Sequence, residues 1–286
     1  MSPEPTDADA VANANANANA NANANATLAA FRLDGRVALI TGAGQGIGAA
    51  TAVAMADVGA DVALTARTES DLEAVAEAVR ARGRRALVLP GDVNDLDHLA
   101  AVVAATTDGL GRLDVLVNNA GGSVSKPFLD TTVKQLESSF HFNVSAAFEL
   151  SRLAVPSMLD GGGGAIVNIG SVAGRNAGRG TLTHSLTKAS VAQLTRLMAA
   201  DLAPRVRVNG VLPGAVETAA LRRWVAPEIR ETMASRTAMR RNGTPEDIAL
   251  AVLYLASPAA SWVTGKLLEV DGLAGEDLVP KDIPDL

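Results

Sequence analysis

A glycine-rich turn between an apolar run and an amphipathic segment constrains the fold of this chain more than any other feature. Residues 36–41 contain four consecutive apolar side chains, which is typical of a strand buried on both faces. Glycines at 42, 44, 46 and 48 follow, and residues 47–58 then repeat apolar side chains at helical spacing. Residues 61–66 are a second apolar run. This strand–helix–strand unit predicts a parallel sheet covered by helices.

The glycine-rich turn is a candidate anion site. Glycines permit a tight turn and let a diphosphate approach backbone N–H groups at a helix start, where the helix dipole favours negative charge. A turn without a ligand is the alternative, but the flanking strand and helix favour binding. The candidate cofactor-binding residues here are Gly42, Gln45, Gly46, Ile47 and Gly48.

The alternation of strand and helix patterns continues to the end of the chain. Further strands are predicted at 85–90, 115–118, 165–169, 205–212 and 267–270. Helices are predicted at 69–82, 95–107, 132–158, 183–202, 221–224, 227–239 and 245–256. Seven strands with intervening helices predict a doubly wound parallel sheet with helices on both faces.

Polar, glycine or proline residues lie at the carboxyl ends of five of the predicted strands. Ligands of such sheets bind beyond the carboxyl ends of the strands. The residues at these ends are Gly42, Asp92, Asn118, Ser171 and Pro213. Each could also satisfy local backbone groups, but their common edge predicts one binding site there.

Composition excludes several kinds of protein. The chain has 286 residues, a net charge of −6 and no cysteine, so disulfides and thiolate chemistry are ruled out. Its three histidines are scattered at 98, 141 and 184, which argues against a histidine metal site. Without a basic block, and without an apolar run near the ~20 residues that span a bilayer, we expect neither a nucleic-acid nor a membrane partner. We expect a cytoplasmic protein.

The first 27 residues differ from the rest. An acidic, proline-containing start is followed by alternating alanine and asparagine up to residue 26. This tract has nothing large to bury and lacks the basic start and apolar run of a secretory signal, so residues 1–27 are predicted to be a disordered tail. No linker-like composition interrupts the remainder. We therefore predict one domain over residues 28–286, including a substrate loop at 215–240.

Several motifs occur in a fixed order between about Leu33 and Gly272. They are Thr41-Gly42-x-x-x-Gly46-x-Gly48, Asp92-Val93, Asn118-Asn119-Ala120-Gly121, Ile169-Gly170-Ser171, Asn209-Gly210-Val211-Leu212-Pro213-Gly214 and Val270-Asp271-Gly272. In these motifs the chain resembles the short-chain dehydrogenase/reductase family, and its C-terminal part resembles 3-oxoacyl-carrier-protein reductase-like members. The resemblance implies a single-domain Rossmann fold and hydride transfer between NAD(P) and a carbonyl or secondary alcohol.

The resemblance also implies roles for individual residues. The catalytic positions are Asn143, Ser171, His184 and Lys188. The cofactor positions, besides the glycine turn, are Arg67, Asp92, Val93, Asn119, Lys188, Pro213, Gly214, Val216 and Thr218. Members of the family form four-helix dimer interfaces, and the apolar helices 132–158 and 183–202 therefore predict a homotetramer, with a homodimer as the alternative.

One position departs from the family pattern. The family's Tyr-x-x-x-Lys is His184-x-x-x-Lys188 here, and the only tyrosine, Tyr254, lies in a late helix. In the family the tyrosine moves the proton, the lysine lowers its pKa and holds the ribose, and the serine binds the substrate oxygen. Histidine can donate and accept protons but is shorter, so a bridging water is expected. The nearby lysine should keep His184 neutral.

Three interpretations of His184 remain open. The first is a working oxidoreductase that uses His184, directly or through water, as acid and base. The second is a cofactor-binding scaffold or sensor that has lost catalysis. The third is a reductase of an imine or activated alkene whose proton comes from water.

The end of the second strand and the late helical segments indicate the cofactor and the substrate. Ala66-Arg67 ends the second strand where NAD-preferring members place an acid, so Arg67 favours NADP, and NAD is the alternative if Arg67 is only a solvated charge. An apolar or mixed small-molecule substrate is indicated by Leu221, Trp224, Val225, Ile229 and Met233. Neither the substrate nor the reaction direction is identified.

Overall fold

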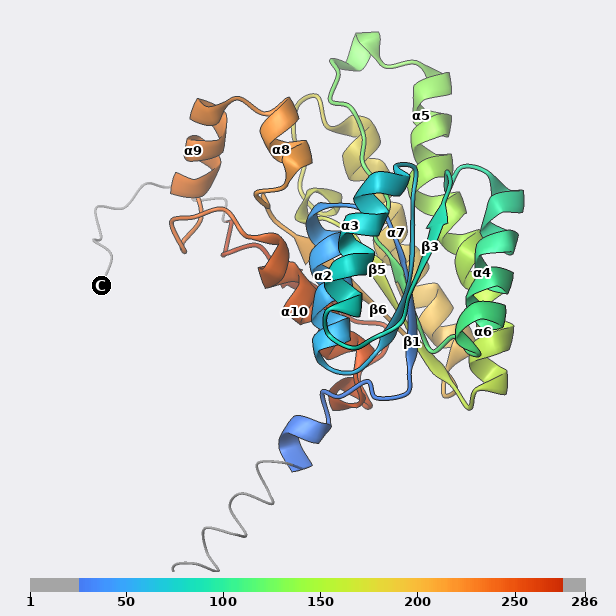
Figure 1. Ribbon diagram of the computed structural model, residues 1–286. Helices are drawn as coiled ribbons and strands as arrows, with labels where there is room; N and C mark the ends of the chain where they lie inside the picture. The colour runs from blue at the N-terminus through green and yellow to red at the C-terminus, as the bar shows by residue number, and fades with distance from the viewer. Residues whose placement is uncertain (1–25, 275–286) are drawn as a thin grey trace, which may run out of the picture.

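The computed structural model describes residues 26–274, which build a seven-stranded parallel sheet (Figure 1). The strands are β1 (Val37–Thr41), β2 (Asp61–Ala66), β3 (Ala86–Pro90), β4 (Val115–Asn118), β5 (Gly164–Ile169), β6 (Val206–Pro213) and β7 (Leu267–Val270). Their order is β3-β2-β1-β4-β5-β6-β7, and every neighbouring pair is parallel. The chain moves outward from β1 to β3 and then restarts at β4 in the other direction. The predicted doubly wound Rossmann-type sheet is therefore confirmed.

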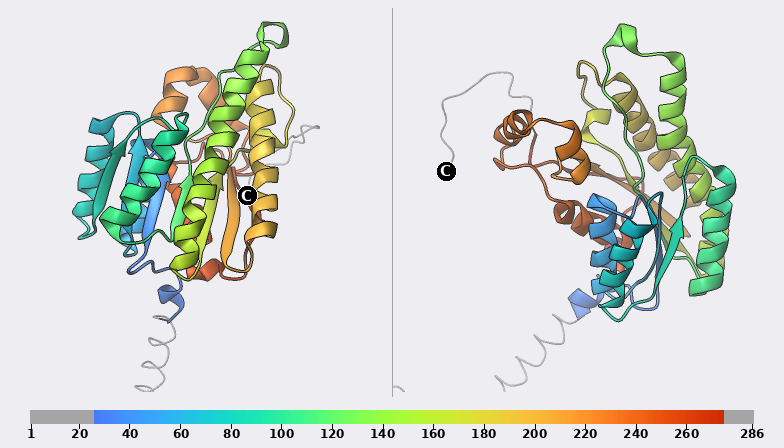
Figure 2. Two further views of the ribbon diagram at one scale, coloured as in Figure 1. Left: turned by 90° about the vertical axis from the view of Figure 1, so that its right-hand side faces the viewer. Right: turned by 45° about the horizontal axis from the view of Figure 1, so that its top comes forward.

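Helices cover both faces of the sheet. One face carries α2 (Gly46–Asp57), α3 (Glu69–Arg80) and α10 (Pro245–Ala256), whose apolar side chains form one core with the sheet. The other carries α4 (Leu96–Leu110), α6 (Ala146–Asp160) and α7 (Leu182–Leu202), the layer toward the viewer in the left view of Figure 2. The remaining helices are α5 (Val133–Phe140), α8 (Ala219–Trp224) and α9 (Pro227–Ser235), with short 3₁₀ turns at Phe128–Asp130, Val172–Gly174 and Pro258–Ala260.

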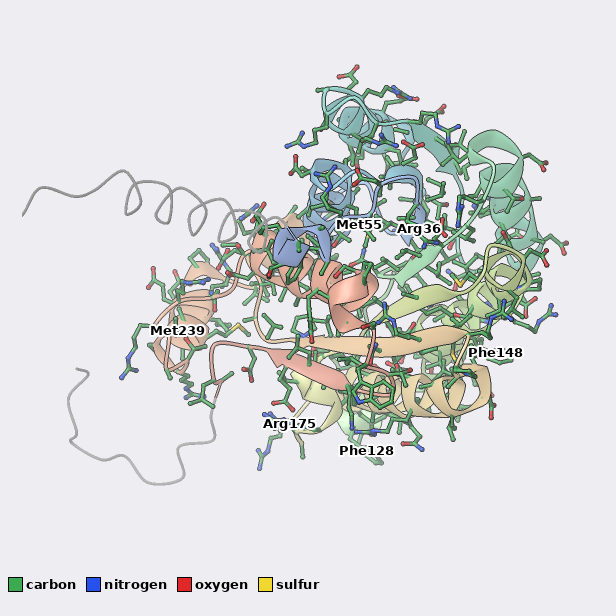
Figure 3. The ribbon with its side chains drawn as sticks, turned by 90° about the horizontal axis from the view of Figure 1, so that it is seen from below. Arg36, Met55, Phe128, Phe148, Arg175 and Met239 are labelled. Atoms are coloured by element: carbon green, nitrogen blue, oxygen red, sulfur yellow. The ribbon has the colours of Figure 1, made fainter. Side chains whose placement is uncertain are left out.

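Alternation along the strands divides the core into these two layers. In β1, Ala38 and Ile40 pack against the α2 side, whereas Val37 and Leu39 pack against the α4 side. Successive side chains of a strand point to opposite faces, so a strand buried on both faces needs apolar residues throughout. Met55 of α2, labelled in Figure 3, is fully buried in the first layer.

A buried polar network joins the centre of the sheet to the second helix layer. The Nδ2 of Asn118, at the end of β4, donates to Asn168 Oδ1 at 2.9 Å and to Ser151 Oγ at 3.0 Å. Asn168 Nδ2 in turn donates to Thr195 Oγ1 at 2.9 Å. These bonds connect β4 and β5 with α6 and α7. Asn118 therefore supports the sheet rather than facing the strand-end cleft described below.

Two predicted helices end differently in the structure. The single helix predicted at 132–158 is α5 and α6 separated by a π-helical segment, His141–Ser145. The helix predicted at 227–239 ends at Ser235 because the N–H groups of Ala238 and Met239 donate to the carbonyls of Leu273 and Gly272 instead.

The predicted tail and the domain limits are only partly covered by the structure. Residues 1–25 of the tail and 275–286 of the predicted domain lie outside the described residues. Residues 26–29 form one helical turn, so the last two residues of the predicted tail are helical. The domain limits stay a prediction.

We predict that Asn168→Leu lowers the free energy of unfolding by about 2–4 kcal/mol, because it removes two buried hydrogen bonds, the one that Asn168 accepts from Asn118 Nδ2 and the one that it donates to Thr195 Oγ1. Denaturant unfolding of the purified protein measures this change. Glu77→Leu, on the exposed side of α3, is the control and should change stability by less than about 0.5 kcal/mol. Equal stability of the two variants would contradict the role of the network.

Candidate active site

A cleft of about 570 Å³ opens beyond the carboxyl ends of β1 to β6. Most of the candidate residues line it. They are Gly42, Gln45, Gly46, Ile47, Arg67, Asp92, Val93, Asn119, Ser171, His184, Lys188, Pro213, Gly214, Val216 and Thr218. Gly48 and Asn143 are buried behind the lining and support the loops that form it. Because the carboxyl ends of parallel strands lie at one edge of the sheet, the fold brings together residues that are up to 176 positions apart, from Gly42 to Thr218.

The glycine turn after β1 depends on missing side chains. Gly42 and Gly46 have φ of +62° and +56°, a region that residues with a Cβ rarely adopt. A Cβ on Gly48 would lie 2.3 Å from the Gly42 carbonyl oxygen and 2.7 Å from Asn119 Nδ2. Asn119 Nδ2 donates to the carbonyls of Thr41 and Gly42 at 2.9 and 3.1 Å. The turn is held tightly against β4.

The N-terminus of α2 is suited to an anion. Gln45 occupies the N-cap position, but within residues 26–274 no side chain caps this helix and its first turn contains no acid. The first N–H groups of a helix have no intrahelical acceptor, and here they belong to Gly46 and Ile47, which line the cleft. The residues present therefore fit the diphosphate of a dinucleotide.

Two charges of opposite sign lie at the end of β2. Arg67 is exposed and forms no ion pair within 4.0 Å with a carboxylate of residues 26–274. Asp71 also lines the cleft, and its Cβ would lie 3.0 Å from a Cβ added to Gly44. The sequence analysis missed Asp71 because an acid in the first turn of a helix is ordinary helix chemistry.

Ser171, His184 and Lys188 lie on the same wall of the cleft. Ser171 follows β5, and its Oγ accepts the Ala173 N–H at 3.1 Å, so its hydroxyl hydrogen can be donated elsewhere. His184 and Lys188 are one turn apart on α7, which places both side chains on one face.

The Lys188 ammonium is buried beneath the cleft. The side chain is 6% exposed, and Nζ donates to the Ile169 carbonyl oxygen at 2.8 Å. Burial lowers the pKa of Lys188 to about 8. Lysine therefore remains mostly protonated at pH 7, at a cost to folding stability.

His184 is half-buried, and burial is the larger cause that lowers its pKa, followed by the charge of Lys188. The imidazole is therefore neutral at pH 7, with one N–H donor and one acceptor nitrogen. Neither ring nitrogen hydrogen bonds to a group among residues 26–274. Both are available to a ligand or to water.

Asn143 lies in the π-helical segment and fastens the loop after β4. Its Nδ2 donates to the carbonyls of Gly122 and Ser139 at 2.8 and 2.9 Å, and its Oδ1 accepts the Gly122 N–H at 2.9 Å. A wider helical turn leaves backbone groups that a side chain can satisfy. A Cβ on Gly121 would meet Asn143 Oδ1 at 2.8 Å and Lys188 Nζ at 3.0 Å, so Asn143 and Lys188 border the same spot.

The segment after β6 covers the opposite side of the cleft. Thr218 caps α8 by accepting the Leu221 N–H at 3.1 Å, and a Cβ on Gly46 would lie 3.1 Å from Thr218 Cγ2. Leu221, Trp224 and Val225 line the cleft as predicted, whereas Ile229 and Met233 of α9 do not. The apolar pattern did not distinguish the two helices because both contain large apolar side chains.

Other polar residues are explained by packing. Tyr254 of α10 packs beside Phe31, with ring centroids 6.4 Å apart. His141 Nε2 lies 2.9 Å from the Asn94 carbonyl oxygen, and His98 Nε2 lies 3.4 Å from Thr65 Oγ1. Gly122 and Ser123, in the loop after Gly121 that the sequence predicts to border the substrate, line the cleft, and Phe142 is a lining residue that was not predicted.

Comparison with known proteins is consistent with this geometry. Residues 42–272 match the family model described as enoyl-(acyl carrier protein) reductase. The chain is 48% identical over 261 residues to an uncharacterized oxidoreductase of Mycobacterium tuberculosis, covering 91% of this chain and 99% of that protein. It is 40% identical over 248 residues to 7α-hydroxysteroid dehydrogenase of Escherichia coli strain K12, covering 86% and 97%.

A solved structure also matches this chain over most of its length. A 7α-hydroxysteroid dehydrogenase complexed with NADH and 7-oxo glycochenodeoxycholic acid superposes with a TM-score of 0.83 at 40% identity, covering 85% of this chain and 96% of that one. The chain belongs to the short-chain dehydrogenase/reductase family. The family resemblance predicted from the motifs is confirmed, and with it the general activity, NAD(P)-dependent oxidoreduction of small molecules. No helix within residues 26–274 is long and apolar enough to span a bilayer.

We predict that Lys188→Met stabilises the protein without cofactor by about 2–3 kcal/mol at pH 7, because it removes a buried charge. The folded-state pKa of about 8 lies below the ordinary value of 10.5, so the unfolded chain binds more protons between these values. Wild-type stability should therefore rise relative to the variant from pH 8 to pH 10.5. Denaturant unfolding across this pH range measures the difference in unfolding free energy between the wild type and Lys188→Met.

The exposed Lys266→Met serves as the control for that measurement and should show no such difference. A Lys188→Met protein that is less stable than wild type at pH 7 would contradict the buried-charge account.

Proposed function

We propose that this protein transfers a hydride between a nicotinamide cofactor and a carbonyl or secondary alcohol, with His184 at the position of the family's tyrosine as acid and base. The observation that carries the proposal is the placement of His184, Lys188 and Ser171 in the cleft that the glycine turn also lines. A proton-transfer group, a cation and a hydroxyl donor thus lie beside a diphosphate-binding turn.

The chain's own groups account for the proton chemistry. NAD(P), when bound, accepts or supplies the hydride. Gly42, Gly46 and the start of α2 would hold its diphosphate, and Lys188 with Pro213 and Thr218 would border its nicotinamide end. In alcohol oxidation, Ser171 binds the substrate oxygen and neutral His184 takes the hydroxyl proton as the C–H hydride leaves. In reduction, the imidazole returns that proton to the oxygen, directly or through one water.

The buried charge of Lys188 favours catalysis over the scaffold or sensor alternative. An ammonium whose pKa falls to about 8 on burial lowers stability. A protein that only binds a cofactor would use it for the ribose alone, whereas an enzyme would also use it beside the proton-transfer group. The charge also lowers the pKa of His184, which keeps the imidazole in the form that can accept a proton. We therefore rank the oxidoreductase first. The imine or activated-alkene reductase with water as the proton donor stays the second enzyme alternative.

We predict that His184→Ala lowers kcat for secondary-alcohol oxidation by about 10²–10⁴-fold, while the Kd for the cofactor changes little. Because the pKa of His184 lies below its ordinary value of 6.5, wild-type oxidation should lose activity only as pH falls below 6.5. His184→Tyr should move this limb to higher pH. Steady-state rates across a panel of ketones and secondary alcohols test all three expectations.

The same panel separates the alternatives. Unchanged turnover in His184→Ala would contradict proton transfer by His184. Absence of turnover in the wild type, together with tight cofactor binding and activity gained in His184→Tyr, would favour the scaffold or sensor.

We further propose NADP as the preferred cofactor, with NAD as the alternative. The exposed guanidinium of Arg67 at the end of β2 has no carboxylate partner within residues 26–274 and can pair with a 2′-phosphate. Asp71 at the same end of the cleft opposes this preference by its charge. The related dehydrogenase of known structure is complexed with NADH, which supports NAD as the alternative.

We predict that Arg67→Ala weakens NADP binding by about tenfold and leaves NAD binding within about twofold. Calorimetric titration with each cofactor gives both values of Kd. Asp71→Asn should shift the ratio the other way, because it removes the opposing charge. An unchanged ratio in Arg67→Ala would reject the NADP preference.

We also propose a homotetramer, with a homodimer as the alternative. Large apolar side chains remain exposed on adjacent helices of one face, among them Phe148 of α6 (Figure 3) and Leu186 and Leu197 of α7, at 48%, 47% and 56% exposure. Leu250 of α10 and Trp262 are also exposed. Burial of such surfaces against other copies would stabilise the assembly.

The cytoplasmic location predicted from the sequence stays a prediction.

A further inference from the structure

A second concave surface adjoins the cleft, and we name it the basic groove. It has a volume of about 1160 Å³ and is bordered by the loop after β4, the start of α5 and the end of β2. Lys126, Lys134 and Arg67 are its cationic lining residues. The groove shares Arg67, Gly122, Ser123 and Phe142 with the cleft, so the two are continuous. The proposed reaction does not use Lys126 or Lys134.

The charges of the basic groove are unbalanced. Most arginines in residues 26–274 pair with a carboxylate, as Arg36 does with Asp114 at 2.6 Å. Lys126, Lys134 and Arg67 have no such partner within 4.0 Å among these residues. Glu137 is the one carboxylate in the groove's described lining. Because Arg67 is assigned above to a 2′-phosphate, Lys126 and Lys134 are the cations of this concavity that the proposed function leaves unpaired. In a chain with net charge −6, two such cations in one concavity indicate an anionic ligand.

Lys126 is held in place by its backbone. Its N–H donates to the Gly180 carbonyl oxygen at 2.9 Å, which ties the loop after β4 to the loop before α7. The Lys126 residue is half-buried, whereas Lys134 extends from the first turn of α5 into solvent. The backbone of Lys126 is therefore fixed beside the groove, whereas the exposed Lys134 side chain can adjust to a ligand. The hydroxyls of Thr131 and Ser138 donate to the carbonyls of Pro127 and Lys134 at 3.0 and 2.7 Å. Ser123 is the lining hydroxyl that can donate a hydrogen bond to a ligand, when Thr183 is the donor of the bond that the two share.

The groove reaches the reacting centre through one hydrogen bond. Ser123 Oγ and Thr183 Oγ1 are 2.6 Å apart, and Thr183 is the residue before His184. Ser123 lines both concavities, whereas Thr183 lines the groove and His184 lines the cleft. A molecule whose reacting carbon lies at Ser171 and His184 can therefore extend over Ser123 toward Lys126.

We infer that the substrate is an alcohol or ketone with an anionic group at the end of an extended tail, and that the basic groove binds this group through Lys126 and Lys134. The inference rests on the proposed function for the position of the reacting carbon. The apolar residues Leu221 and Trp224 would contact the body of the substrate, and the groove would select its charged end.

The test uses methyl ketones with aliphatic tails of graded length that end in a carboxylate or a phosphate monoester, compared with the uncharged methyl ester of each carboxylate. Reduction is followed by cofactor absorbance, and binding to the cofactor-saturated protein is followed by calorimetry. The variants are Lys126→Glu and Lys134→Glu. Lys266→Glu, an exposed lysine before β7 that also lacks a carboxylate partner within 4.0 Å in residues 26–274, is the matched control.

We expect the wild type to prefer an anionic tail of suitable length over its ester in both kcat/KM and Kd. Each groove variant should lower this preference by about threefold to tenfold and leave the ester unaffected, and the control should retain it. The preference should also weaken at high salt. The carboxylate and phosphate series identify which anion the groove prefers.

Binding and turnover separate the two proposals. Selective binding of the anionic tail that Lys126→Glu abolishes, without turnover of any ketone, would uphold the groove and reject the proposed function. Equal affinity for acid and ester at every length, or a preference that survives both groove substitutions, would overturn the groove inference even if turnover is rapid.

Discussion

Parallel pairing of all seven strands is the constraint on which the site depends. Parallel strands require a crossover after each strand, so every carboxyl end and every following loop lies at one edge of the sheet. The chain adds strands in one direction from β1 to β3 and in the other direction from β4 to β7. The loops after β1 and β4 therefore diverge and leave a cleft between them. The glycine turn after β1 and Ser171 after β5 meet at that opening. No direct bond between them is needed, because the sheet register positions both.

The buried polar groups of the proposed site lower the stability of the folded protein. The Lys188 ammonium is buried with the Ile169 carbonyl oxygen as its hydrogen-bond acceptor, and its pKa is lowered to about 8. The same charge, added to burial, keeps His184 neutral. Asn143 holds the adjoining loop from a widened helical turn. Irregular helix geometry and a desolvated cation thus occur where the proposed reaction needs positioned polar groups, while Asn118 and Asn168 stabilise the sheet beneath them.

Much of the fold could be predicted because its signals are local. An apolar run of strand length, a glycine turn and a helix of regular period specify a parallel unit without long-range information. The division of the 132–158 helix could not be predicted in this way, because the π-helical segment is stabilised by contacts of Asn143 with the distant Gly122. The end of α9 likewise depends on hydrogen bonds to residues 272 and 273. The residues near each of these helix ends do not indicate which distant groups will bond to them.

By itself, the sequence determined the sheet type, the family motifs and the residues that follow each strand, since these depend on composition and spacing along one stretch of chain. It also showed a histidine four residues before Lys188. Only the tertiary structure decided how deeply Lys188 is buried, that Asn143 and Gly48 stand behind the cleft, and that Lys126 and Lys134 share a groove with Arg67. The physical reason is that burial and charge balance are sums over neighbours from separate segments, and folding alone brings those neighbours together.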